Sequence, residues 1–154
     1  MSQLRKQLSA PGLIKIVYQQ FLKIPETRNF SRKATISLVD HLMSGLAIFG
    51  LKCPSLLDFD KKRSDSVVAQ NLHDLYHVNI APCDTYLRER LDQVEPDRIR
   101  PSFTRIFTAF QRGKGLEEFD FHNGYVLISG DGTGLFSSSK VSCPHCCKKE
   151  HQNG

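Results

Sequence analysis

The sequence predicts a mainly α-helical protein, with a helical N-terminal domain over residues 1–115 followed by the first strand of an α/β domain over residues 116–154. Two patterns predict this organisation. Before Gly115, apolar residues recur at helical spacing in several segments; after it, a short aliphatic run, "YVLIS", is bounded by glycines. Hydrophobic content of 40% and charged content of 24% are those of an ordinary globular chain.

The first predicted helix runs from about Ala34 to about Gly50, and Pro54 follows it. His41 lies among apolar neighbours and is interpreted as structural. One broad apolar stripe defines the helix: Ile36, Val39, Leu42, Met43, Leu46 and Ala47.

Two shorter amphipathic segments, "SDSVVAQNLHDLYHV" and "CDTYLRERLDQVEP", follow on either side of the break "NIAP". In the second segment Asp84 or Thr85 is available as the cap, and Pro96 is expected to end the helix. The apolar faces are expected to contain Val68, Leu72, Leu75 and Tyr76 in the first segment and Leu87, Leu91 and Val94 in the second. Arg88, Glu89, Arg90 and Gln93 are expected to face away.

This pair of helices is compatible with a helix-turn-helix, in which Thr85, Arg88 and Arg90 would face DNA. Glu89 and Asp92 on the same face would repel phosphate, so simple packing of the two helices is the favoured interpretation.

A further amphipathic helix is predicted from about Pro101 to Arg112, ending before two glycines. Its aromatic and aliphatic stripe is interpreted as core: Phe103, Ile106, Phe107 and Phe110. The strand Tyr125–Ser129 is expected to be buried on both faces.

Asp131 follows this strand between two glycines, where open α/β sheets usually place their chemistry. A phosphatase-type nucleophile two residues earlier is missing, because that position is Ser129. "GDGTG" also lacks the lysine of a P-loop. Two interpretations remain from the residues alone: a carboxylate ligand for Mg²⁺, or a turn former.

The net charge of +5 is unevenly spread along the chain. Residues 1–63 hold 11 Lys/Arg against 4 Asp/Glu, a net +7, whereas residues 64–154 carry a net −2. A basic half can bind a polyanion such as DNA or can be a solvated face. The candidate DNA contacts here are Arg28, Arg32, Lys33, Lys61, Lys62 and Arg63.

The cysteines suggest a reducing compartment. The N-terminus lacks the apolar core of a secretory signal, so the five cysteines are expected to be thiols or metal ligands in the cytoplasm. Cys143 and Cys146 form a C-x-x-C pair that His151 and one further neighbour could complete as a zinc site; a loop of free thiols is the alternative. The longest apolar run, "LAIFGL", is too short to span a membrane, and no membrane partner is expected.

Three stretches together, "DHLMSGLAIFGLKCPSLLDFD", "NLHDLYHVNIAPCDTYLRERLDQVEPDRIRPSFTRIFTAFQRGKGLEEF" and "YVLISGDGTGLFSSSKVSCPHCCKK", resemble bacterial insertion-sequence transposases of the DDE type. The resemblance covers the chain from about Thr35 to its last residue. It implies a ribonuclease H-like catalytic domain in which Asp131 is the first Mg²⁺-binding carboxylate, preceded by a helical region that contacts transposon-end DNA. A homo-oligomer of the full-length enzyme is a candidate assembly.

The second aspartate and the glutamate of the family lie well downstream of the first, whereas here only Glu150 follows Asp131 before the chain ends at Gly154. The chain is therefore expected to be an N-terminal fragment with a truncated ribonuclease H-like domain, catalytically incomplete because one carboxylate cannot hold two Mg²⁺ ions. Two alternatives remain: a stand-alone helical DNA-binding or regulatory protein that competes for transposon ends, and a remnant without function.

Overall fold

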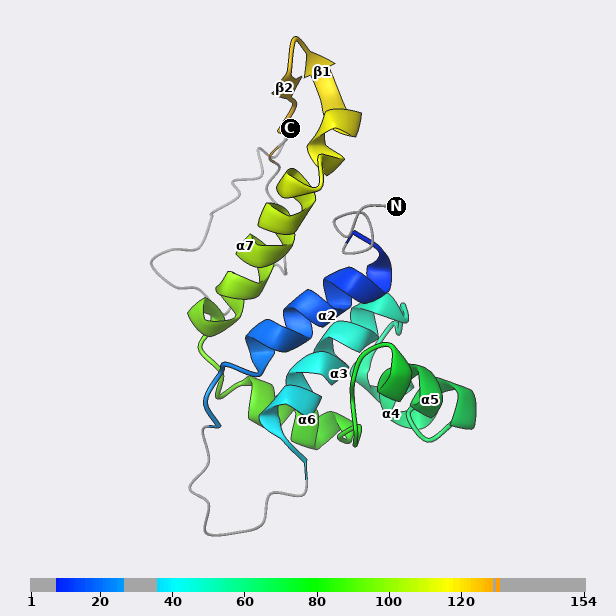
Figure 1. Ribbon diagram of the computed structural model, residues 1–154. Helices are drawn as coiled ribbons and strands as arrows, with labels where there is room; N and C mark the ends of the chain where they lie inside the picture. The colour runs from blue at the N-terminus through cyan, green and yellow to red at the C-terminus, as the bar shows by residue number, and fades with distance from the viewer. Residues whose placement is uncertain (1–7, 27–35, 129, 131–154) are drawn as a thin grey trace, which may run out of the picture.

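The structure is a computed structural model that describes residues 8–26, 36–128 and 130. Within these residues the protein is mainly helical, with one small two-stranded antiparallel sheet (Figure 1). The helices are α2 (Ala10–Phe21), α3 (Leu38–Gly50), α4 (Leu56–Lys62), α5 (Ser66–Asp74), α6 (Asp84–Leu91) and α7 (Pro96–Arg112). A 3₁₀ helix η1 (Gly115–Phe119) leads into the strands β1 (Asp120–His122) and β2 (Tyr125–Val126).

Helix α3 is the centre of the core. Ser37 caps it by accepting a hydrogen bond from the backbone N–H of Asp40, which sets the start a few residues later than the predicted Ala34. The predicted end at Gly50 is confirmed. Helices α2 and α6 both pack against α3, so its apolar stripe and its flanks are covered. The buried residues of α3 are Leu38, Asp40, His41, Leu42, Met43, Ser44, Ala47 and Ile48.

Helix α2 was not predicted, although its sequence carries the signal. The Ser9 hydroxyl accepts from the backbone N–H of Gly12, and a proline occupies the first turn, as in many helix starts. Ile14, Val17 and Phe21 then follow at i, i+3 and i+7, which turns one face toward α3.

The two short segments form helices α5 and α6, and the predicted apolar faces are confirmed: Leu72, Tyr76, Leu87 and Val94 are buried, and Val68, Leu75 and Leu91 are partly buried against the same core. The two helices do not form a closely packed helix-turn-helix, because α6 packs mainly on α3 and α4. The segment between them is tied to α3 instead: the backbone N–H of Asn79 donates to the Asp40 carboxylate. Pro96 does not end α6, which stops at Leu91, but begins α7.

Helix α7 starts five residues before the predicted Pro101, which lies inside it. The assignment of its whole aromatic stripe to the core is wrong: Phe103 is 63% exposed and Phe107 is 56% exposed. The side of α7 that packs against the core is rotated from the predicted stripe: Ser102 is buried, and Ile106 of the stripe is partly buried against the core. The large aromatic residues therefore lie beside the contact rather than within it.

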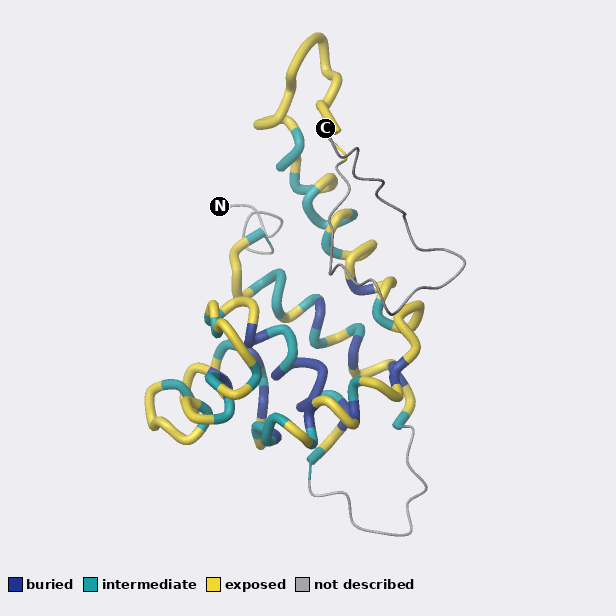
Figure 2. Tube along the Cα trace, turned by 180° about the vertical axis from the view of Figure 1, so that it is seen from behind, coloured by how far each residue is buried: buried dark blue, intermediate teal, exposed yellow. Residues whose placement is uncertain are grey.

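The predicted strand also differs from the structure. Only Tyr125–Val126 is extended, and it pairs with β1 in a short hairpin beyond the end of α7 (Figure 2). The prediction that the strand is buried on both faces is wrong for its described residues, because Tyr125, Val126, Leu127 and Ile128 are all exposed. No other described strand pairs with this hairpin, so the residues described here form no larger sheet.

Gly50 offers a test of how α3 meets the α5 region. A Cβ atom at Gly50 would overlap the hydroxyl of Tyr76, whose buried ring closes this side of the core. We expect Gly50→Ala to destabilise the fold by about 1–3 kcal/mol, because the added methyl group overpacks this site. The replacement of glycine by alanine in a helix also gains up to about 1 kcal/mol of helix propensity, which reduces the net loss. Chemical denaturation measures the difference. In a Tyr76→Phe background the substitution should cost less, and an equal cost in both backgrounds would contradict the overlap.

Candidate nucleic-acid interface

The structure tests only part of the candidate site set. The basic residues Arg28, Arg32 and Lys33 lie outside the described residues. The same holds for Asp131, the candidate Mg²⁺ ligand, and for the candidate zinc ligands Cys143, Cys146 and His151. These assignments stay predictions.

The three basic residues at the end of α4, Lys61, Lys62 and Arg63, have different environments. Arg63 is half-buried and stabilises the fold: its Nε donates to the Asp60 carboxylate at 2.8 Å, and its Nη1 donates to the Ala81 carbonyl at 3.1 Å. Lys62 is exposed and pairs with Asp58 across one helical turn at 2.9 Å, and this hydrogen bond raises the pKa of Lys62. Lys61 is exposed and forms no ion pair with any described acidic side chain.

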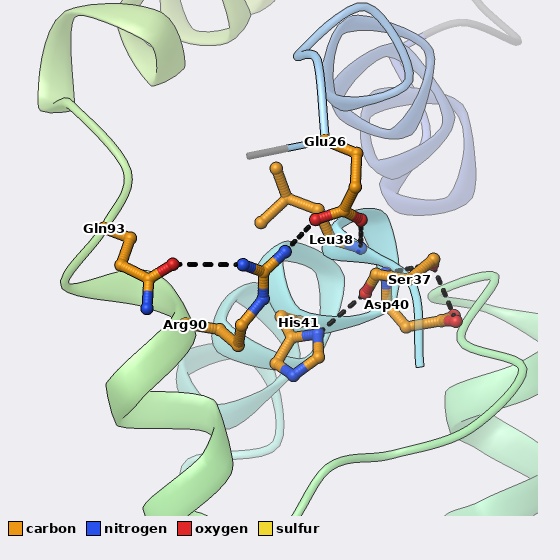
Figure 3. Close-up of polar contacts among 7 residues, drawn as sticks. All are labelled: Glu26, Ser37, Leu38, Asp40, His41, Arg90 and Gln93. Carbon is orange, nitrogen blue, oxygen red and sulfur yellow. Dashed lines mark hydrogen bonds and ion pairs between the residues drawn. The ribbon is translucent and has the colours of Figure 1, made fainter. Parts of the chain in front are cut away.

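Arg90 has an internal role, and the expectation that it faces away from the protein is wrong. Its side chain is only 2% exposed, and Nη2 contacts the Glu26 carboxylate (Figure 3). Nη1 donates to Gln93 Oε1 at 3.1 Å. The second carboxylate oxygen of Glu26 accepts from the backbone N–H of Leu38 at 3.0 Å. One ion pair thus joins the segment after α2, the start of α3 and the end of α6.

A second set of polar contacts lies beside this pair. Asp40 accepts from the Ser37 hydroxyl at 2.8 Å and from the backbone N–H of Asn79 at 2.8 Å. His41 is fully buried, with Nδ1 2.7 Å from the Ser37 carbonyl oxygen and its ring edge-to-face with Tyr86. The interpretation of His41 as structural is confirmed by this burial. These groups hold the domain together and are not open to a ligand.

On α6, the exposed residues Thr85 and Arg88 remain available to a partner. Glu89 and Asp92 are exposed on the same helix, so its surface carries both signs of charge. Helix α6 packs against α4, which carries Lys61 and Lys62 in its last turn. Exposed basic side chains therefore extend from two neighbouring helices.

Sequence reasoning missed two further exposed arginines, Arg105 and Arg112 on α7. Their spacing of seven residues places them two turns apart on one face of the helix. That spacing indicates a basic face on the helix, but the aromatic residues between the two arginines favoured the interpretation of the helix as core.

The described residues hold no cluster of three or more His, Cys, Asp or Glu side chains that could bind a metal ion. Cys53 and Cys83 are free thiols, both partly buried. Burial, reinforced by the nearby Asp58 carboxylate, raises the pKa of the Cys53 thiol, which reduces its reactivity. In the part of the chain that the structure describes, no helix is both long and apolar enough to cross a membrane.

The chain matches no protein-family model, and it matches neither a curated protein nor a solved structure.

Proposed function

We propose that this chain is the DNA-binding, N-terminal part of a DDE-type transposase, and that its helical region contacts transposon ends. The resemblance of the three sequence stretches supports the family. The structural support is one observation: Lys61 and Arg88 stay exposed on two helices that pack together, without an acidic partner among the described residues. Cationic side chains that are not neutralised internally are free to release counterions from phosphate.

In this proposal, the chemistry of the full-length enzyme is phosphodiester cleavage and strand transfer with Mg²⁺. Asp131 contributes the first carboxylate, and the remaining two come from sequence downstream in the family. Because one carboxylate cannot hold two ions, no nicking of DNA is expected from this chain alone. Zinc at Cys143, Cys146 and His151 is a separate proposal that rests on the C-x-x-C spacing.

The alternative is a helical DNA-binding or regulatory protein that acts by itself and competes for transposon ends. One observation favours it: α2 to α7 build a shared core without any contribution from the hairpin that follows them. Both functions require DNA binding, and they differ in whether a catalytic domain belongs to the working protein.

DNA binding is tested by titrating a labelled duplex carrying a transposon-end sequence with the full chain at several salt concentrations. We expect affinity to fall steeply with salt, and the double variant Lys61→Ala/Arg88→Ala to reduce the slope of log K against log salt by about 1.8, or 0.9 per lost phosphate contact. The measurement is fluorescence anisotropy.

The matched control is Arg98→Ala/Lys114→Asn, which removes the same charge from two residues already paired with Glu95 and Glu117. Asparagine tolerates the left-handed backbone of Lys114 (φ 62°). The control should bind nearly as the parent does. If the parent chain fails to bind DNA at low salt, the proposed function is wrong.

A further inference from the structure

Helices α2 and α7 lie along one another (Figure 1). The surface between them is hollowed. Gln20, Thr108 and Ala109 are partly buried in this hollow, whereas Gln19 and the two arginines are exposed along it. A second hollow continues toward the start of α7 and shares Gln20 and Arg105 with the first. The two together form a groove, here called the α2–α7 groove, that follows α7 from Asp97 to Arg112.

The openness of the groove, and not its size, argues against an enclosed small-molecule site. The two hollows measure about 210 and 400 Å³, and the larger lies within the roughly 300–1,000 Å³ of pockets that hold drug-sized ligands. Both hollows are open to solvent, and the first is lined by amides, a hydroxyl and guanidinium groups together with the apolar side chains of Ile16 and Ala109. An open groove edged by cations suits a chain of small charged groups that passes along it.

The charge of the groove is positive and is not neutralised within the described structure. Arg105 and Arg112 form no ion pair with a described acidic side chain, whereas Arg98 and Arg100, on the same helix, pair with Glu95 and Asp97. Lys23 adds a third cation, because its Nζ donates to Gln20 Oε1 at 3.3 Å. The one carboxylate along the groove, Asp97, lies at its far end and is held by Arg100 at 3.2 Å.

The spacing of the two arginines suits a nucleic-acid backbone. Seven residues of α-helix span about 10.5 Å at 1.5 Å per residue, so the two guanidinium groups lie far enough apart to contact two different phosphates of one backbone. Each arginine guanidinium group can donate two hydrogen bonds to one phosphate. The amides of Gln19 and Gln20 along the groove offer further, neutral donors. Contacts from such groups to phosphate fix the position of a duplex without reading its sequence.

We propose that the α2–α7 groove binds the phosphate backbone of duplex DNA, with Arg105 and Arg112 each contacting one phosphate. This inference rests on the proposed function and adds a second contact surface to it, on helices other than α4 and α6. A duplex held at both surfaces is oriented relative to the domain, which a single patch of lysines cannot achieve.

The test compares Arg105→Ala/Arg112→Ala with the parent and with the charge-matched control Arg98→Ala/Lys114→Asn, using the full chain and a short synthetic duplex. We expect the groove variant to bind roughly tenfold or more weakly at low salt, and its salt slope to fall by about 1.8. Thermal melting checks that all variants fold. If the alanine variant is unfolded, Arg105→Gln/Arg112→Gln replaces it, because glutamine keeps the length and most of the packing of the side chain.

The outcomes separate the two proposals. A loss confined to the groove variant supports the groove. Equal losses of DNA affinity in the groove variant and the control would show a general effect of net charge and would contradict DNA binding at the groove. If the groove variant binds DNA as the parent does, with the same salt dependence, the groove does not bind DNA, while the proposed function is unaffected. A parent chain that does not bind DNA would overturn both.

Discussion

Replacing Glu26 by alanine is expected to destabilise the folded protein by about 3 kcal/mol, at the lower end of the 3–5 kcal/mol measured when a buried ion pair loses one partner. The physical reason is the burial of Arg90, whose side chain is 2% exposed and cannot recover its hydration when the carboxylate is removed. The lower end applies because Glu26 is 23% exposed and Gln93 still accepts from Arg90. Denaturation in guanidinium chloride measures the loss.

Two companion variants show whether charge or packing is responsible. Glu26→Gln keeps an acceptor for the Leu38 backbone N–H and should lose less than the alanine variant. Arg90→Met removes the buried charge with a side chain of similar volume and should also cost less than Glu26→Ala. If Glu26→Ala and Arg90→Met destabilise equally, the ion pair does not dominate this site.

Replacing Asp40 by alanine is expected to cost about 2–4 kcal/mol. The substitution removes the charged acceptor of the Asn79 backbone N–H, and a hydrogen bond to a charged group contributes about 1.5–3 kcal/mol. It also removes the acceptor of the Ser37 hydroxyl, a further loss of up to about 1 kcal/mol, while the cap bond from the backbone N–H of residue 40 to Ser37 is kept. Urea denaturation gives the total, and amide hydrogen exchange at Asn79 should become fast.

Asp40→Asn is the matched control for this substitution. The amide oxygen can still accept from the Asn79 N–H, so the loss should be about half that of alanine or less. If Asn79 exchanges as slowly in Asp40→Ala as in the parent, the carboxylate is not what anchors the segment between α5 and α6.

The helices near the core could be predicted because their signals are local. Gly50 and the apolar stripe from Ile36 to Ala47 lie within a few turns of one another, and the spacing of apolar residues indicates which face is buried. The start of α7 could not be placed in the same way. Proline occurs both at the first position of a helix and after its end, so Pro96 and Pro101 fit either assignment until tertiary packing decides.

The errors at Arg90 and Phe103 have a common cause. The sequence predicts the helix around each residue, but which face of that helix is buried depends on a partner far away in sequence. Arg90 turns inward because Glu26, 64 residues earlier, supplies a carboxylate there. Phe103 turns outward because α2 packs on the neighbouring face of α7. A single sequence contains both partners, but it does not show that they lie close together in space.

The same limit governs the candidate site. The charge excess suggested Arg63 as a DNA contact and the helix-turn-helix interpretation suggested Arg90, whereas both side chains hold elements of the fold together. Arg105 and Arg112 lie in a half of the chain that is net negative, so the charge count does not indicate them. They differ from Arg98 and Arg100 on the same helix, because those two arginines pair with Glu95 and Asp97. Which cations are available to a partner is a property of the folded surface.

The long sequence separation of Glu26 and Arg90 also has a kinetic consequence. Between them lie α3, α4 and α5, and bringing the two ends of this segment together carries a loop-closure entropy that only the folded helices offset. We therefore expect the pair to form late, after the transition state for folding has been crossed. Its loss should leave the folding rate nearly unchanged and appear almost entirely as faster unfolding, so this contact sets the lifetime of the native state.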